Sequence, residues 1–292
     1  MFVLAHISDL HLSYRPRLIE LAGKRGLGFV NWMRGRRYIH RAEIVDAITR
    51  DLKANAPDHI AVTGDLVNLS LPGEYARARS WLAQLGPAHD VTVIPGNHDI
   101  YVPQTRRGPA EFWGDYMRGD DGAASGTFPF IRRRGDVSLI ALSTAVPTGA
   151  FMATGELGEE QLARLVQALQ ATHETFRVVL IHHPPVSPPE RYLRRLIDAA
   201  AFRRVLAEHG AELVLHGHDH RRALVWLDGP GGRIPAVGVP SASARIPHGH
   251  ENAAGYNLYR IDGGTKAWRC EMIARERGSD GQVREVERRL LS

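Results

Sequence analysis

Polar side chains collect directly after five short apolar segments of the sequence. The segments read FVLAHISD (2–9), HIAVTGD (59–65), VTVIPGN (91–97), FRVVLIHH (176–183) and ELVLHGHDH (212–220). The residues at or just beyond their ends are Asp9, His11, Asp65, Asn97, His98, Asp99, His182, His218 and His220. Carboxylate, amide and imidazole groups are ligands for borderline divalent cations such as Mn, Fe, Co, Ni or Zn. The residue types therefore predict a metal site.

The set of donors is too large for one ion. Two aspartates, one asparagine and four histidines would fill the shells of two ions that share one carboxylate. Two ions about 3.5–4 Å apart can hold a bridging hydroxide and clamp a phosphoryl group during in-line displacement. Gly64, Gly96 and Gly217 stand beside the donors and would let the backbone turn tightly next to ion and substrate.

The elements that must position these donors are predicted from the apolar pattern. The five segments and VSLIALST (137–144) lack strict alternation, which is typical of strands covered on both faces. Helices are predicted at about 42–55, 73–86, 105–118, 159–171 and 191–208. After residue 220 the pattern predicts only strands, in RALVWLD, IPAVGVP, YNLYRID and AWRCEMIAR, and then a short helix in the closing VREVERRLL.

These elements predict one layered α/β domain over residues 1–292 with a β-rich part from about residue 221. Two sheets packed face to face with helices outside would account for the pattern. In open α/β sheets the carboxyl ends of the strands converge on one crevice. Donors that are far apart in the sequence should therefore meet there.

Five ordered motifs resemble those of the calcineurin-like metallophosphoesterase family. They are Asp9-x-His11, Gly64-Asp65, Gly96-Asn97-His98-Asp99, His182 and Gly217-His218-x-His220, and the resemblance covers about residues 1–245. It implies a four-layer αββα sandwich of two mixed β-sheets flanked by helices. It also implies two divalent ions with Asp65 as the bridge. The ligands implied for one ion are Asp9, His11, Asp65 and His220, and those for the other are Asp65, Asn97, His182 and His218.

The resemblance also implies a mechanism. The bridging hydroxide attacks phosphorus, Asn97 and His98 contact the substrate, and His98 protonates the leaving oxygen as general acid. Asp99 is a candidate to orient His98. Protein serine/threonine phosphatases of the family have an aspartate for that task three residues after the bridging one, where this sequence has Asn68. The departure favours the small phosphodiesterase branch.

The motifs GNHD and HHPP are most similar to those of the bacterial class III cyclic nucleotide phosphodiesterases. The expected function is therefore dinuclear metal-dependent hydrolysis of a small phosphodiester, with a 3',5' or 2',3' cyclic nucleotide as first substrate. The alternative is a membrane-surface pyrophosphatase or phosphatase acting on a lipid-linked substrate such as UDP-diacylglucosamine. A degenerate site in a binding module is a third hypothesis, which the presence of every expected ligand disfavours.

Residues 14–41 form an insert of distinct composition between the first strand and the first helix. Its only acidic residue is Glu20, against eight basic ones: Arg15, Arg17, Lys24, Arg25, Arg34, Arg36, Arg37 and Arg41. Apolar residues are interleaved with them: Leu27, Phe29, Val30, Trp32 and Met33. The insert could be a packed loop with solvated charges, a lid or dimer contact over the site, or, through residues 18–41, a patch that docks on an anionic membrane or an acyl-bearing substrate. Nucleic-acid binding ranks last.

Composition sets the remaining limits. The 292 residues are 43% hydrophobic and 24% charged, as in ordinary globular proteins, and the net charge of +5 suits an anionic partner without choosing one. Cys270 is the only cysteine, which excludes an intrachain disulfide and fits a reducing compartment. The first residues make a poor signal peptide. We therefore expect a cytoplasmic protein, with peripheral contact at the inner membrane surface under the alternative function, and the oligomeric state stays open.

Four histidines next to the motifs have no assigned role at this stage. His183 and His216 adjoin expected ligands and could orient them or only pack. His248 and His250 lie in a late loop that could reach the site or remain solvated. His6, within the first strand, is expected to be structural.

Overall fold

The computed structural model describes the whole chain except residues 22, 32, 34–38, 248, 250 and 266. Some residues named above therefore lie outside the described part of the chain. They are Trp32, Arg34, Arg36, Arg37, His248 and His250.

Two six-stranded mixed sheets form the centre of the molecule. The first sheet has the order β12-β11-β10-β1-β2-β3. Its strands are β1 (Phe2–Ile7), β2 (His59–Val62), β3 (Val91–Val93), β10 (Gly255–Asp262), β11 (Arg269–Arg277) and β12 (Val283–Leu290). β1, β2 and β3 are parallel, and β10 joins β1 in the antiparallel sense. The three parallel strands therefore end at the same edge.

The second sheet has the order β4-β5-β6-β7-β9-β8. Its strands are β4 (Phe130–Arg134), β5 (Val137–Ala141), β6 (Phe176–Leu180), β7 (Leu213–His216), β8 (Ala223–Gly229) and β9 (Gly232–Gly238). β5, β6, β7 and β9 are parallel to one another, whereas β4 and β8 are antiparallel edge strands. The strands predicted for both sheets are present.

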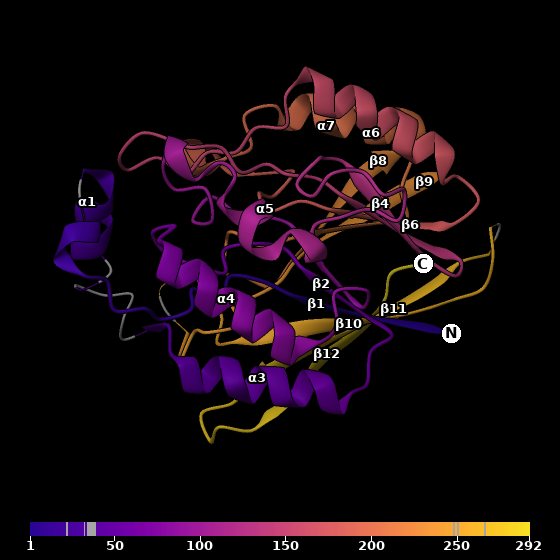
Figure 1. Cartoon of the computed structure of the whole chain (residues 1–292). Helices are drawn as coiled ribbons and strands as arrows, with labels where there is room; N and C mark the ends of the chain where they lie inside the picture. Colours follow the sequence, from indigo (N-terminus) through magenta and orange to yellow (C-terminus); the bar gives the residue numbers. More distant parts are fainter. Residues whose placement is uncertain (22, 32, 34–38, 248, 250, 266) are drawn as a thin grey trace.

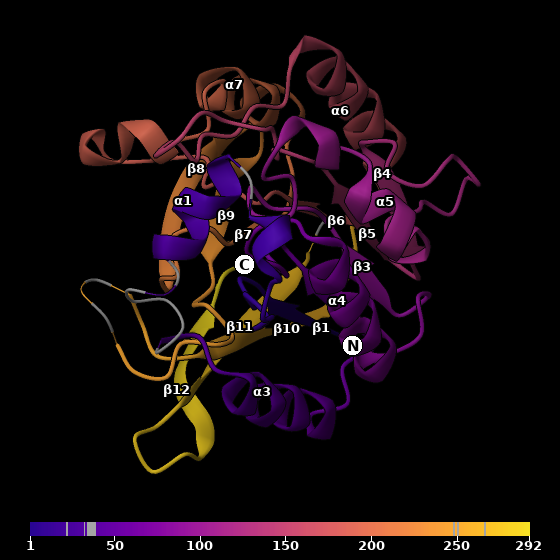
Figure 2. The same cartoon turned by 60° about the vertical axis from the view of Figure 1, so that its left-hand side comes forward.

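Helices cover the outer faces of the two sheets (Figures 1 and 2). The α-helices of the described residues, including those away from the sheet faces, are α1 (Lys24–Asn31), α3 (Ala42–Ala54), α4 (Pro72–Leu85), α5 (Gly108–Trp113), α6 (Glu159–Ala171) and α7 (Ala199–His209). Figure 1 shows α3 and α4 outside the first sheet and α6 and α7 outside the second. This arrangement is the αββα sandwich that the sequence predicts.

Two apolar cores explain why the strands lack a polar face. In the second sheet Leu139, Val178 and Leu213 point toward the first sheet and join the core between the sheets. Their neighbours Ile140 and Val179 point the other way, into a second core beneath α6 and α7. Alternate side chains along each strand point to opposite faces, so a strand buried on both faces must be apolar throughout.

Three predicted elements differ from the structure. The closing VREVERRLL forms strand β12, so the predicted terminal helix is wrong. The edge of β11 offers backbone partners along its length, and Arg288 of β12 pairs with Glu271 of β11 at 2.9 Å. Sheet pairing thus overrides the local helix propensity of Glu and Arg.

The other two differences concern helix length. The predicted helix 105–118 is reduced to α5 and short 3-10 turns, and the predicted helix 191–208 begins only at Ala199. Before it, Pro189–Arg194 form a 3-10 turn, and Arg195 is extended. The IRRR segment of β4 had no strand prediction because its residues are mostly charged.

Arg132 joins β4 to the end of the first sheet. Its side chain is buried and donates hydrogen bonds to the carbonyls of Ala88 (2.6 Å), Val91 (2.7 Å), Asp115 (2.9 Å) and Arg118 (2.8 Å). A buried guanidinium is tolerated when its donors are satisfied, as they are here.

We expect Arg132→Met to lower the free energy of unfolding by about 2–4 kcal/mol, because buried carbonyls would lose their donors. The exposed neighbour Arg133→Met is the matched control and should cost less than about 1 kcal/mol. Urea denaturation measures both. Equal stability of the two variants would contradict this role of Arg132.

Candidate active site

All seven predicted metal ligands come together at the carboxyl ends of five strands. Asp9 and His11 follow β1, Asp65 follows β2, and Asn97 follows β3. His182 follows β6, and His218 and His220 follow β7. The site therefore lies between the two sheets, and each of the seven side chains is buried.

The backbone that presents the ligands is strained. Asp9, His11, Asp65, His218 and His220 all have φ between 44° and 69°, in the left-handed region. This conformation costs roughly 1–2 kcal/mol for a non-glycine residue and persists only where tertiary contacts hold it. These five positions therefore carry Asp or His because the site needs those side chains, although glycine would fit the backbone with less strain.

The carboxylate of Asp99 holds the turn that carries Asp65. One of its oxygens accepts hydrogen bonds from the amides of Asp65 and Gly96, both at 2.8 Å. The other accepts from the amides of Leu66 (2.9 Å) and Val67 (3.1 Å). Asp99 is therefore a positioning residue for Asp65.

His98 is oriented by a different group. Its Nδ1 lies 2.7 Å from the carbonyl oxygen of Asn68, and its ring stacks on Tyr101 with centroids 5.6 Å apart. These contacts correct the expectation that Asp99 orients His98. Asn68, which stands where the protein phosphatases have an aspartate, still orients His98, but through its main-chain carbonyl.

One group of donor atoms converges around Asn97. Its Oδ1 lies 3.0 Å from Nδ1 of His218 and 3.2 Å from Nε2 of His182. Nε2 of His182 is also 3.5 Å from Oδ2 of Asp65. Two donors about 2.1 Å from one cation lie about 3.0–3.5 Å apart at coordination angles of about 90–110°, so these separations fit a shared ion.

A second group converges around His220. Its Nε2 lies 3.3 Å from Oδ1 of Asp9 and 3.2 Å from Nε2 of His11. Nε2 of His11 is 3.9 Å from Oδ2 of Asp65, which also belongs to the first group. Oδ1 of Asp9 is buried and makes no hydrogen bond among the described residues. Asp65 thus faces both groups.

The outer nitrogen of each ring is fixed on an oxygen. Nδ1 of His11, His182 and His220 lies 3.4, 2.7 and 3.0 Å from the Val67 carbonyl, the Thr63 carbonyl and Oε2 of Glu251. For His218 the outer nitrogen is Nε2, 2.9 Å from the Arg194 carbonyl.

Carbonyl and carboxylate oxygens only accept hydrogen bonds, so the outer nitrogen carries the proton. When the ring is neutral, its inner nitrogen therefore turns a lone pair toward the group of donors. Such partners orient metal-binding histidines in proteins. Sequence reasoning missed Glu251, because nothing local links it to His220.

The electrostatics favour positive charge between the ligands. Burial opposes protonation of His182, but the Asp65 carboxylate raises its pKa to about 9. The carboxylates of Asp9 and Glu251 likewise raise the pKa of His220 to about 9 despite its burial. Burial also disfavours the Asp65 anion, yet His182 and His98 lower its pKa below the usual range. The cluster attracts protons, and it would attract cations for the same reason. The residues present fit two divalent ions.

Two predicted glycines permit this close approach. A Cβ on Gly96 would lie 2.2 Å from Oδ1 of Asp65, and one on Gly217 would lie 2.0 Å from Oγ of Ser8. Any larger residue at either position would push the ligand strands apart.

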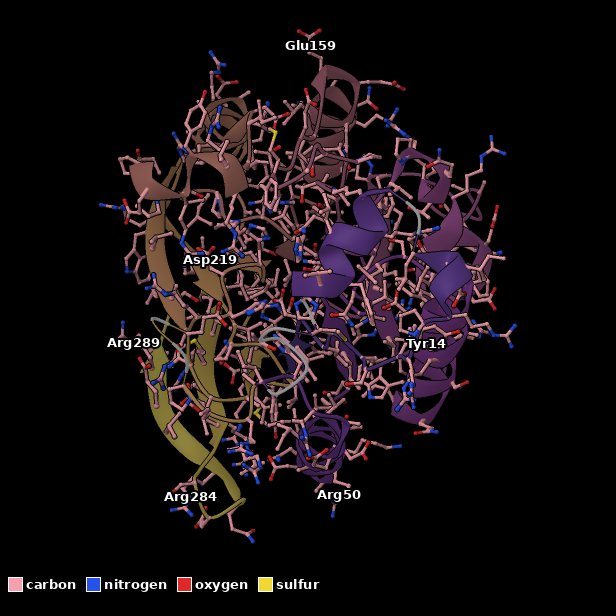
Figure 3. All side chains as sticks on the ribbon, turned by 90° about the vertical axis from the view of Figure 1, so that its left-hand side faces the viewer. Tyr14, Arg50, Glu159, Asp219, Arg284 and Arg289 are labelled. Atoms are coloured by element: carbon pink, nitrogen blue, oxygen red, sulfur yellow. The ribbon has the colours of Figure 1, made fainter. Side chains whose placement is uncertain are left out.

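A cavity of about 500 Å³ opens onto the donors, and Asp65, Asn97, His98, His218 and His220 line its floor. Helix α1 of the insert covers it and contributes Leu27 and Val30. In Figure 3 α1 crosses the face of the molecule that carries the site, between the labelled Asp219 and Tyr14. The segment 150–153 and Arg194 complete the wall. The described part of the insert therefore lies over the site.

The basic residues of α1 attach it to the domain. Nζ of Lys24 donates to the carbonyls of Thr148 (2.9 Å) and Tyr101 (3.1 Å). Arg25 donates to the carbonyls of Leu69 (3.1 Å) and Ser70 (2.8 Å). Both positively charged side chains therefore bind backbone carbonyls of the domain.

The neighbouring histidines are structural. His183 lies 2.7 Å from Oγ1 of Thr144 and 3.1 Å from the Ala153 carbonyl, and its ring packs on His182 and His218. His216 contacts the Gly217 carbonyl at 3.2 Å. His6 belongs to β1, and its Nε2 lies 2.9 Å from Oγ1 of Thr63. Burial lowers the pKa of His6 to about 3.

Comparison with known proteins agrees with this geometry. The profile of the calcineurin-like phosphoesterases matches residues 2–222. The chain belongs to this family. It is a metal-dependent phosphoester hydrolase.

Two relatives of this phosphoesterase carry names of phosphodiesterases. A Synechococcus sp. protein named "probable cyclic nucleotide phosphodiesterase" is 30% identical over 75% of this chain and 73% of its own. The glycerophosphodiester phosphodiesterase GpdQ of Enterobacter lignolyticus is 25% identical over 87% and 82%. A purple acid phosphatase from yellow lupin (Lupinus luteus) has a TM-score of 0.61 at 13% identity, over 97% of this chain and 52% of its own. The last likeness concerns the fold alone.

A search of the described helices for a membrane span finds none with the length and apolar character required.

We expect Asp65→Asn to bind fewer ions, because the shared anionic ligand is lost while Oδ1 can still accept from the amide of His98 (2.8 Å). Affinity for Mn²⁺ should fall by more than about a hundredfold at one site or both, since the loss of a supporting residue alone costs about 10–100-fold. Titration calorimetry of the chelator-treated protein measures this, with the half-exposed Asp90→Asn as control. Two ions bound with wild-type affinity would contradict a bridging Asp65.

Proposed function

We propose that this phosphoesterase hydrolyses small phosphodiesters, with cyclic nucleotides as the first substrate class, at a centre of two divalent cations. The observation that carries the proposal is the convergence of four oriented imidazoles and two carboxylates, of which Asp65, His218 and His220 line a cavity beside His98. The names of both relatives support a diester rather than a phosphoprotein. The location that we propose for a protein with this function is the cytoplasm.

The donor groups assign the ligands of each ion. Asp9, His11, Asp65 and His220 would hold one cation, and Asp65, Asn97, His182 and His218 the other. The donor types suit Mn, Fe, Co, Ni or Zn. When bound, the cations would supply Lewis-acid stabilisation of charge on the phosphoryl oxygens.

The side chains on the cavity wall have separate tasks in this proposal. Arg194 lines the cavity and would attract the anionic diester. The Asn68 carbonyl holds the Nδ1 proton of His98, so the ring can give a proton from Nε2 only as imidazolium. His98 would in this way protonate the departing alkoxide. Asn97 would contact the same substrate beside it.

We expect His98→Ala to lose about 10²–10⁴-fold in kcat/KM on a cyclic nucleotide, whose ribose oxygen needs a proton to leave. The loss on bis(p-nitrophenyl) phosphate should be much smaller, because nitrophenolate leaves unprotonated. Steady-state kinetics of the metal-reconstituted protein measures both losses, with the exposed His89→Ala as control. Equal losses on the two substrates would exclude His98 as the acid, and inert diesters would exclude the proposed function.

A second candidate function is hydrolysis of a lipid-linked pyrophosphate such as UDP-diacylglucosamine at a membrane surface. The observation in its favour is the apolar part of the cavity wall. Leu27, Val30, Phe151 and Met152 line the cavity yet are 55%, 44%, 87% and 40% exposed. An acyl chain would cover them. Lys24 and Arg25, however, are bound to backbone carbonyls rather than offered to lipid headgroups.

Under this second candidate, the double variant Leu27→Ser/Val30→Ser should raise KM for the diacyl substrate about tenfold or more, since each buried apolar side chain contributes about 1.5–3 kcal/mol. Ile19→Ser, exposed on the same insert but outside the cavity lining, is the control. Point variants leave the α1 contacts in place, which a deletion of residues 18–41 would remove. Hydrolysis of the diacyl substrate with inert cyclic nucleotides would make this candidate the function. Inert diacyl substrate would exclude it.

A further inference from the structure

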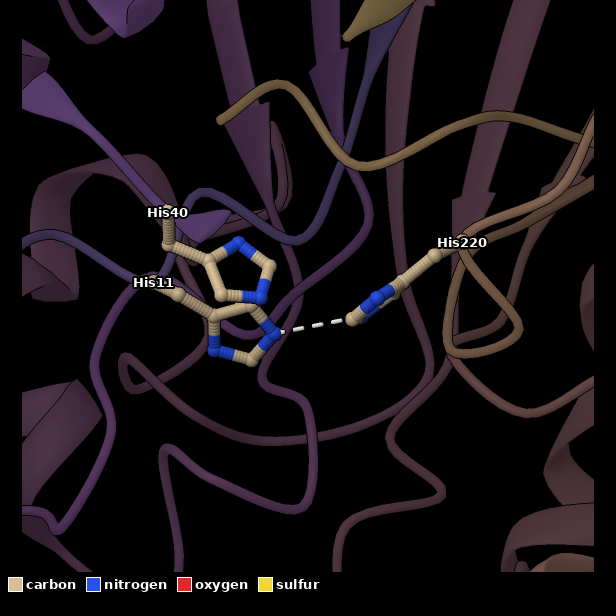
Figure 4. Close-up of side chains that lie close together, drawn as sticks. All are labelled: His11, His40 and His220. Atoms are coloured by element: carbon tan, nitrogen blue, oxygen red, sulfur yellow. Dashed lines mark hydrogen bonds between the residues drawn. The ribbon is translucent and has the colours of Figure 1, made fainter. Parts of the chain in front are cut away.

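His40 lies beside the second group of donors, the one around His220, and belongs to none of the motifs. It ends the insert, is 3% exposed, and pairs with Ala244 in an isolated antiparallel bridge. Figure 4 shows its ring next to those of His11 and His220. The ring centroids are 4.7 Å from His11 and 5.6 Å from His220. One nitrogen of each ring lies within 4.8 Å of the other two.

A chain of hydrogen bonds fixes the proton of His40. The chain begins at the Asp9 carbonyl, which only accepts, so Oγ of Ser241 donates to it at 2.6 Å. Ser241 has then used its single proton, and Oγ of Ser243 donates toward two nearby acceptors, Oγ of Ser241 at 3.1 Å and the same Asp9 carbonyl at 3.3 Å. Ser243 has in turn used its proton. The 2.7 Å contact between Ser243 and Nδ1 of His40 must therefore be donated by His40.

This tautomer places a lone pair on Nε2 of His40. Figure 4 shows that edge of the ring turned toward His11 and His220. The pattern matches the four histidines of the centre, each of which has its outer nitrogen fixed on an oxygen and its inner nitrogen turned toward the other donors. His40 shares this feature although no motif contains it.

The backbone around His40 is held on both sides. The amide of Arg41 donates to the Ser243 carbonyl at 3.1 Å, and the amide of Arg245 donates to the Ile39 carbonyl at 2.9 Å. The amide of Ala242 donates to the Ser8 carbonyl at 3.0 Å, next to Asp9. His40 and Asp9 are thus positioned by one segment, residues 241–245.

We propose that Nε2 of His40 is a further ligand of the cation held by Asp9, His11 and His220. The inference rests on the proposed metal centre. Donors at about 2.0–2.3 Å from one ion lie at most about 4.5 Å apart, and the three nitrogens, which lie within 4.8 Å of one another, are close to that limit. The added imidazole raises the nitrogen content of this ion's shell and makes the two ions chemically unlike. It also ties the end of the insert to the metal centre.

The test is a cobalt titration of the full chain after chelator treatment, with absorption spectroscopy. Wild type should bind two Co²⁺ per chain. His40→Phe keeps an aromatic ring but removes the nitrogen, so one Co²⁺ should bind about tenfold or more weakly. Its visible absorption should strengthen as the coordination number falls. The matched control is His59→Phe, because His59 is also buried and pairs with Thr92 away from the centre.

Each outcome of the titration decides the inference. Two sites with unchanged affinity and an unchanged spectrum in His40→Phe would overturn it and leave the metal centre intact. Failure of the wild type to bind two Co²⁺ would overturn the proposed centre and this inference together. If His40→Phe does not fold, His40→Asn replaces it and should show the same loss. Ser243→Ala, which keeps the imidazole but removes its anchor, should give a smaller loss than either.

Discussion

The structure depends on one electrostatic constraint: seven donors turn lone pairs and negative charge toward one another in a gap between two sheets, and only positive charge between them makes this stable. The raised pKa values of His182 and His220 express the same demand in terms of protons. Left-handed turns at five ligands and glycines at two close approaches are conformational costs of the arrangement. Asp99 offsets part of that cost by holding four amides of the Asp65 and Gly96 turns.

The fold explains why such a site can exist in an otherwise apolar interior. Every strand that delivers a ligand ends just before it, so the apolar part of the strand belongs to the two cores and the polar residues begin at the sheet edge. The outer nitrogens of His11, His182 and His218 then find backbone carbonyls at that edge, and that of His220 finds the carboxylate of Glu251. The cavity above has two chemical halves, ionic at the floor and apolar beneath α1, which accounts for the two substrate classes considered.

The sequence predicts the part of the site that is local. Strands 2–9, 59–65 and 212–220 end in Asp or His because the turn that presents a ligand must follow directly in the chain. His40, Glu251 and the Asn68 carbonyl act through contacts with residues 30 to 203 positions away, for which no short pattern exists. The same limit explains β12, whose helix-forming residues are paired by the edge of β11. Asp99 belongs to a sequence motif, but its amide partners appear only in three dimensions.

The most direct test of the account is a crystal structure of the protein grown with Mn²⁺ and measured at the manganese absorption edge. The account predicts two anomalous peaks about 3.5–4 Å apart. One should lie among Asp9, His11 and His220, the other among Asn97, His182 and His218, with the Asp65 carboxylate between them. A single peak, or two peaks that do not share Asp65, would contradict it.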